Sequence, residues 1–293
     1  MTTPHLHYKR ILGWCISVLL LGAAIFAIWK RAPDLETAIA AIEHPEPIPL
    51  SVLPILLFVS ILAVSESFRQ LLNRPTILGE GNTPIKQPEM AWLISVAGML
   101  NWLPLRAGLI GRTVYHSKVH GIQATKSLRV LLESVCIIVG VSLLAILVSF
   151  VRGATFIHPL VAMSVPLFVA ALFFFNRGAK PWAIAIACRY IDVTLLAARY
   201  FIIFRLLDNG ISPETAILLA GASSIASLLP LPTGGLGGRE WIIGLLSSWV
   251  TVLPAALAIG LIADLINRVV ELIVVIPLGL LGHRYLKNKN HPR

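Results

Sequence analysis

Glycine, arginine and glutamate lie close together in one short segment of the chain, "LPLPTGGLGGRE", which covers residues 229–240. Glycines let the backbone approach a ligand closely, and free N–H groups at the start of a helix favour negative charge. Arginine adds a full positive charge in a planar fork that suits phosphate. We predict an anion-binding site in which Glu240 orients Arg239 or the ligand; alternatively, the glycines only allow tight packing and Arg239 pairs with Glu240. The predicted site residues of this segment are Gly234, Gly235, Gly237, Gly238, Arg239 and Glu240.

A second segment, "LPLRAGLIGR" at 103–112, resembles the first. With one gap, the two segments share Leu-Pro-Leu, a glycine, a leucine and a final Gly-Arg. Arg112 takes the position of Arg239, and Arg106 lies earlier in the same segment. We interpret the pair as an internal repeat rather than a chance match of common residues, and we predict that Arg106, Arg112 and Arg239 bind one anionic group.

Charged residues also occur inside long apolar stretches, where each costs about 2.5–3.5 kcal/mol to insert into a membrane. Asp264, Arg268 and Glu271 are spaced four and three residues apart, which puts them on one face of a helix. We expect this group to line a cavity, whereas Arg129–Glu133 and Glu66–Arg69 are expected to form ion pairs within single helices. The predicted cavity charges are Asp192, Arg199, Asp264, Arg268 and Glu271.

Catalytic chemistry has little support in the sequence. His116 and His120 flank Lys118, but the cation between them and the missing HExxH pattern favour a solvated face over a metal site. We find no nucleophile paired with a base and no nucleotide-binding loop. The chain is therefore predicted not to be an enzyme, and to use no metal and no cofactor.

The composition indicates an integral membrane protein. Of the 293 residues, 57% are hydrophobic and only 13% are charged, whereas soluble domains carry roughly 25% charge. About 20 apolar residues are needed to span a bilayer, and six runs approach or exceed that length. We predict an all-α fold with about six full transmembrane helices. The runs are 11–29, 50–66, 130–151, 159–175, 182–204 and 252–281.

The net charge of +10 is distributed unevenly along the chain. If the N-terminus is cytoplasmic and each run crosses once, only Lys30, Arg31 and Arg152 fall in outside loops. This asymmetry follows the positive-inside rule. We therefore predict a cytoplasmic-membrane protein with both termini in the cytoplasm, a short basic tail at 283–293, and no nucleic-acid partner.

Two apolar elements, 89–119 and 212–250, are expected to enter and leave the membrane on the same side. The apolar part of the first stops at Pro104, which is too short for a span, and the second has a helix start at Ser212 and then the glycine break. They enter from opposite faces, so they form an inverted repeat of re-entrant hairpins, as in transporters that bind substrate at the midplane. We treat 1–293 as one integral-membrane domain.

Three motifs together, "LPLPTGGLGGRE", "LPLRAGLIGR" and "SLRVLLES", resemble the lysylphosphatidylglycerol synthase transmembrane-region family, which is flippase-like. The resemblance extends from about residue 50 to residue 282. It implies a stand-alone flippase-like domain without the soluble synthase domain that some members carry. Leu109 stands where an acidic residue is often found, so no carboxylate role is carried over to the first segment. The residues that fit the family pattern are Pro232, Gly234, Gly235, Gly237 and Glu240.

Residues and resemblance together predict a protein that moves an amphiphile with an anionic headgroup between leaflets. The candidates are a phospholipid, a polyisoprenoid-linked sugar or another envelope lipid. Its partners would be membrane lipids and an envelope-lipid biosynthetic enzyme. Two alternatives stay open: a transporter of a small water-soluble solute or ion, and a non-transporting scaffold for a lipid-modifying or glycosyltransferase enzyme.

Overall fold

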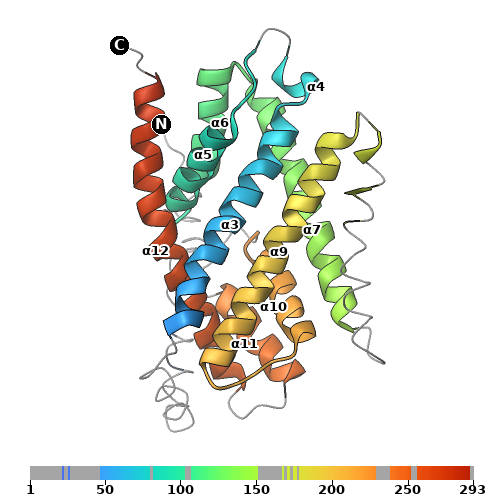
Figure 1. Cartoon of the computed structure of the whole chain (residues 1–293), viewed down its shortest axis with the longest axis vertical. Helices are drawn as coiled ribbons and strands as arrows, with labels where there is room; N and C mark the ends of the chain where they lie inside the picture. Colours follow the sequence, from blue (N-terminus) through green and yellow to red (C-terminus); the bar gives the residue numbers. More distant parts are fainter. Residues whose placement is uncertain are drawn as a thin grey trace, which may run out of the picture.

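A computed structural model gives the fold of this chain (Figure 1). It describes residues 47–79, 82–102, 107–150, 178–228, 238–251 and 256–290, together with a few isolated positions near 22, 26 and 167–176. Within these ranges every regular element is a helix, in agreement with the predicted all-α class. The helices are α3 (Pro47–Leu72), α4 (Pro75–Leu78), α5 (Gln87–Leu100), α6 (Ala107–His120), α7 (Ala124–Phe150), α9 (Lys180–Leu206), α10 (Pro213–Ala226), α11 (Gly238–Val250) and α12 (Ala256–Asn290).

The main helices form two quartets with the same order of lengths: long, short, short, long. The first quartet is α3, α5, α6 and α7, and the second is α9, α10, α11 and α12. Figure 1 shows α3 and α9 side by side and running in opposite directions, with the α5–α6 pair toward one end of the molecule and the α10–α11 pair toward the other. The two short pairs occupy the predicted segments 89–119 and 212–250.

The quartets are interleaved, because each short pair packs on the last helix of the other quartet. Helix α5 lies against α12, and α10 lies against α7. A glycine permits each close approach: a Cβ on Gly282 would lie 2.9 Å from the carbonyl oxygen of Trp92, and a Cβ on Gly221 would lie 2.8 Å from that of Ser142. Any larger residue at these two positions would force the helices apart.

The predicted start of the second short pair is confirmed. Ser212 caps α10, and its side-chain oxygen accepts a hydrogen bond from the backbone N–H of Thr215 at 3.2 Å. Pro213 occupies the first turn, and Glu214 lies at the positive end of the helix dipole. These local signals fix where the helix begins without help from tertiary contacts.

Two described helices, Leu50–Leu72 and Ala124–Leu147, are long and apolar enough to cross a membrane. Helices α9 and α12 are longer, at 27 and 35 residues, but both carry several charged residues. Helix α12 also continues to Asn290, so most of the predicted tail 283–293 is helical. The predicted runs 11–29 and 159–175 fall almost entirely outside the described residues.

Several described helices expose large apolar side chains. Ile55, Leu147 and Ile273 are 60%, 63% and 61% exposed, on α3, α7 and α12 respectively. In the interior, by contrast, Asp264 and Asn267 are fully buried. Exposed apolar residues and buried polar ones together indicate that the helices enclose a polar centre.

Candidate anion-binding cavity

A cavity of about 420 Å³ lies between the two quartets. Five arginines and two carboxylates line it, so the charge of its lining sums to +3. The arginines come from three different sources: α6, α9 and the pair α11–α12. The charged lining residues are Arg112, Arg189, Arg199, Arg239, Arg268, Asp192 and Glu271.

The cavity extends along α9, on which Arg189 and Arg199 lie ten residues and therefore about 15 Å apart. Arg112 and Arg189 lie over the same ring, that of Phe68, and we call this region the α6 end. Arg199 lies near Arg239, and we call that region, with the residues of α12 around it, the α11 end. The two ends differ in how their arginines are neutralised.

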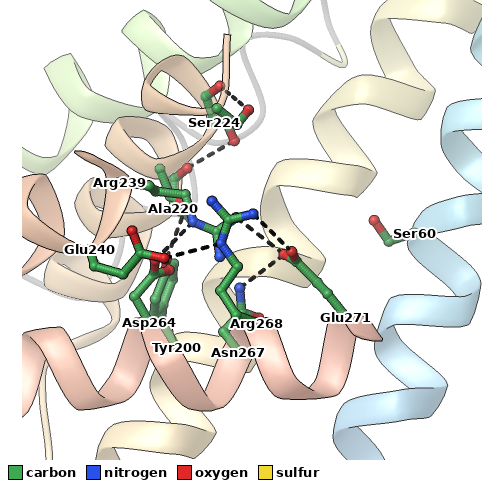
Figure 2. A network of polar contacts seen from close by, with 12 residues as sticks. Ser60, Tyr200, Ala220, Ser224, Arg239, Glu240, Asp264, Asn267, Arg268 and Glu271 are labelled. Carbon is green, nitrogen blue, oxygen red and sulfur yellow. Dashed lines mark hydrogen bonds and ion pairs between the residues drawn. The ribbon is translucent and has the colours of Figure 1, made fainter. Parts of the chain in front are cut away.

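At the α11 end, Arg239 contacts two carboxylates of α12 (Figure 2). Its Nε lies 2.9 Å from Asp264 Oδ2, and its Nη1 lies 3.2 Å from Glu271 Oε1. The Arg239 side chain is only 5% exposed. Two anions of the protein itself therefore compensate this buried cation.

A second arginine of this end, Arg268, continues the network. Its Nε lies 3.4 Å from Glu240 Oε1, and its Nη1 lies 3.7 Å from Glu271 Oε2. Arg268, not Arg239, is thus the ion-pair partner that the structure provides for Glu240. Glu240 therefore does not orient Arg239 in the way that its position in the sequence suggested.

Neutral side chains hold these carboxylates in place. The Tyr200 hydroxyl donates a hydrogen bond to Asp264 Oδ1 and lies 3.0 Å from Ser223 Oγ. Asn267 donates from Nδ2 to Glu271 Oε1 at 3.1 Å. Asp264 is fully buried behind the cavity wall, so of the three predicted charges on α12, Arg268 and Glu271 line the cavity and Asp264 supports them.

Among the described residues, two nitrogens of Arg199 lack a hydrogen-bond partner, against one, Nη2, of Arg239. Arg199 lines the cavity and is 3% exposed, and neither its Nε nor its Nη1 has a partner within the described part of the protein. A buried guanidinium without partners is costly. An anion in the cavity would remove that cost.

At the α6 end, two guanidinium groups share one aromatic ring. The Arg112 guanidinium carbon lies 4.4 Å, and that of Arg189 5.2 Å, from the centre of the Phe68 ring. Arg189 also donates from Nη2 to Ser134 Oγ at 2.8 Å and lies 3.4 Å from Asp192. The ring attracts both cations, but it supplies no negative charge between them.

Some site residues were missed by sequence reasoning, and others lie outside the described residues. Asn267 is four residues from Glu271 on α12, a spacing that could have identified it. Arg189 is three residues from Asp192 on α9, which gave the same kind of signal. Phe68 and Tyr200 carried no comparable signal, because their partners belong to other helices. Gly238 is the first residue of α11. The predicted residues outside the described part are Arg106, Gly234, Gly235 and Gly237.

The prediction of a solvated face at His116 and His120 is wrong. These side chains are 3% and 6% exposed, and His120 Nε2 lies 2.8 Å from Glu89 Oε1 of α5. Tyr115 donates to the same carboxylate oxygen at 2.8 Å. Pairing of α5 with α6 buries this cluster, which the sequence of α6 alone does not reveal. Among the described residues no group of three metal-ligating side chains occurs.

The two ion pairs expected within single helices are confirmed. Arg69 Nη2 lies 2.5 Å from Glu66 Oε1, and Arg129 Nε lies 3.0 Å from Glu133 Oε1. Glu133 additionally pairs with Arg74 of the segment after α3. Both pairs are structural contacts away from the cavity.

No family model matches the chain, and no curated protein or solved structure is similar enough to be matched to it. The family resemblance suggested by the glycine and arginine segments therefore stays a prediction.

Proposed function

We propose that this protein is a flippase-like membrane protein that moves an amphiphile with an anionic headgroup between leaflets. It would lie in the cytoplasmic membrane with both termini inside, with about six spans. The pairs α5–α6 and α10–α11 would be re-entrant hairpins of an inverted repeat. Membrane lipids would be its ligands, and an envelope-lipid biosynthetic enzyme its source of substrate.

The buried, basic cavity is the observation that carries this proposal. Its lining has a charge of +3, and Arg199 keeps two nitrogens without partners at 3% exposure. Arginine suits phosphate and carboxylate groups because it offers several donors in one plane. An anionic headgroup of a lipid is a ligand of that chemistry.

Apolar surfaces support a lipid rather than a free anion as the ligand. One face of α3, α7 and α12 exposes large apolar side chains, such as Ile55, Leu147 and Ile273, which are each at least 60% exposed, as lipid-facing residues are. Apolar residues of α3, α7 and α9 also line the cavity beside the arginines, among them Leu57, Val135 and Leu196. A cavity of this mixed character suits an amphiphile better than a fully hydrated ion.

Reconstitution into liposomes tests the proposal. We would measure the exchange of acyl-labelled phosphatidylglycerol and phosphatidylcholine between leaflets for the wild type, Arg199→Gln and Arg205→Gln. Arg205 is the matched control, because it is an exposed arginine of the same helix. We expect exchange of the anionic lipid by the wild type and by Arg205→Gln, and a loss of about tenfold in Arg199→Gln.

Loss of fold would not explain that result, because removing a buried charge without hydrogen-bond partners at two nitrogens is expected to leave stability unchanged or raise it. Normal exchange by a folded Arg199→Gln protein would refute the assignment. Uptake of free phosphate without lipid exchange would favour a transporter of soluble anions. Neither activity would favour a scaffold.

A further inference from the structure

A second cavity of about 310 Å³ lies between α5, α6 and the C-terminal part of α12. Most of its wall is hydrocarbon, contributed by Leu93, Val96 and Leu100 of α5 and Leu286 of α12. The wall on the α6 side is formed partly by Gly111, which has no side chain to fill the space. Among the described residues the lining of this cavity is therefore mainly apolar, in contrast to the arginine-rich lining of the central one.

Arg112 lines both cavities. Its guanidinium carbon lies 4.4 Å from the centre of the Phe68 ring at the α6 end of the central cavity, and the same residue borders the apolar cavity. A charged group thus stands at the junction of a polar and an apolar compartment. An amphiphile is divided in the same way, because its charged headgroup is attached directly to a hydrocarbon chain.

We propose that the second cavity binds the hydrocarbon chain of the amphiphile whose anionic group contacts Arg112. This inference rests on the proposed function and specifies it, because it requires a ligand with a chain next to the charge. His283 and Lys287 also line the cavity and are exposed. Their position suits attraction of an anionic lipid toward this opening.

Gly111 allows a specific test, because it lines the apolar cavity and not the central one. A Cβ added there would meet only Leu100 Cδ1, at 3.7 Å, which is an ordinary contact. Gly111→Ala therefore fits without strain, and Gly111→Leu fills part of the cavity. Gly140 on α7 is the matched control, because a Cβ there would have nothing within 4 Å.

The experiment measures displacement of radiolabelled inorganic phosphate by unlabelled phosphate and by butyl, hexyl and octyl phosphate. The protein is the full chain in nanodiscs, so that partitioning of the probes into lipid is common to all variants. For the wild type and Gly140→Leu we expect affinity to rise by up to about fourfold per methylene group. For Gly111→Leu we expect an unchanged affinity for phosphate and little gain with chain length, and for Gly111→Ala an intermediate gain.

Three outcomes would overturn the inference, and they are distinguishable. A wild-type gain with chain length in Gly111→Leu means that the chain binds elsewhere. If Lys287→Gln lowers phosphate affinity, and the affinity does not change with the length of the alkyl chain, the second cavity is an anion site. A wild type that binds no phosphate at all removes the proposed function itself, and the chain site with it.

Discussion

The two short helix pairs place matching arginines in very different surroundings. Arg239, at the start of α11, contacts Asp264 and Glu271, both from α12. Arg112, in α6, lies over the Phe68 ring, and the helix that follows it, α7, lines the cavity with Ser134 and apolar residues. Arg112 and Arg239 thus occupy matching positions in the two similar segments, whereas the long helix after each pair decides what the arginine contacts.

This difference assigns separate tasks to the two ends of the cavity. At the α11 end, three arginines face three carboxylates, namely Arg199, Arg239 and Arg268 against Glu240, Asp264 and Glu271. At the α6 end, Asp192, which lies 3.4 Å from Arg189, is the one carboxylate found beside Arg112 and Arg189 among the described lining residues. We expect the α6 end to bind an incoming anion together with Arg199, because less of the positive charge is compensated there and Arg199 keeps two nitrogens without hydrogen-bond partners.

The largest effect is expected where the α11 end is most tightly paired. Asp264→Asn removes a fully buried anion and leaves Arg239 undercompensated, which lowers the free energy of unfolding by about 3–5 kcal/mol. Thermal unfolding of the purified protein measures the change. As a control, Asp264→Asn combined with Arg239→Gln should recover part of the loss; an Asp264→Asn protein as stable as the wild type would contradict the network.

A substitution at the matching arginine should affect binding instead of stability. Arg112→Gln leaves no carboxylate without its cation among the described residues, so we expect the free energy of unfolding to change by less than about 1 kcal/mol. Anion affinity should fall about tenfold or more, because a charge-assisted hydrogen bond is lost. Phosphate displacement measures the affinity. If Arg112→Gln unfolds the protein and Asp264→Asn does not, the comparison is reversed.

Glu271 tests the same comparison by removing a carboxylate from the α11 end instead of an arginine from the α6 end. Its carboxylate lies where an anionic ligand would meet Arg239 and Arg268, so it competes with that ligand. In Glu271→Gln the cavity charge rises from +3 to +4, and we expect phosphate affinity to rise by up to about tenfold. Unchanged or weaker affinity in this variant would show that Glu271 assists binding instead.

The smallest effect is expected outside the cavity. Arg129 is 71% exposed in its pair with Glu133, and exposed pairs contribute about 0–1 kcal/mol. Arg129→Gln should therefore change neither stability nor anion affinity measurably. Chemical unfolding and phosphate displacement of this variant set the baseline for the substitutions at Asp264, Arg112 and Glu271.

Much of the architecture could be predicted from local sequence. The cap at Ser212 was predicted correctly, and the spacing on α12 correctly placed Arg268 and Glu271, though not Asp264, in the cavity lining, because these features depend on residues within one helix. The positions of the two short helix pairs along the chain also followed from the two similar Gly-Arg segments. A charged face of a helix can be recognised from the spacing of the charged residues along that helix alone.

Contacts between helices could not be predicted in this way. Tyr200 meets Asp264 across 64 residues of sequence, and Arg74 meets Glu133 across 59. His120 was assigned to a solvated face because its partner Glu89 lies in the preceding helix. Each of these pairings depends on how two helices cross, and a single periodic pattern carries no information about a crossing.

The interleaving of the quartets has a consequence for how the protein is made. Helix α5 is synthesised early, yet the glycine contact at Gly282 joins it to α12, the last of the described helices. That side of the first short pair thus stays without its cover until α12 has been made. Helix α10, in contrast, finds α7 already made. The face of α5 that binds α12 is therefore uncovered during synthesis. A chain that ends before α12 would expose this face permanently, and quality-control proteases could recognise it.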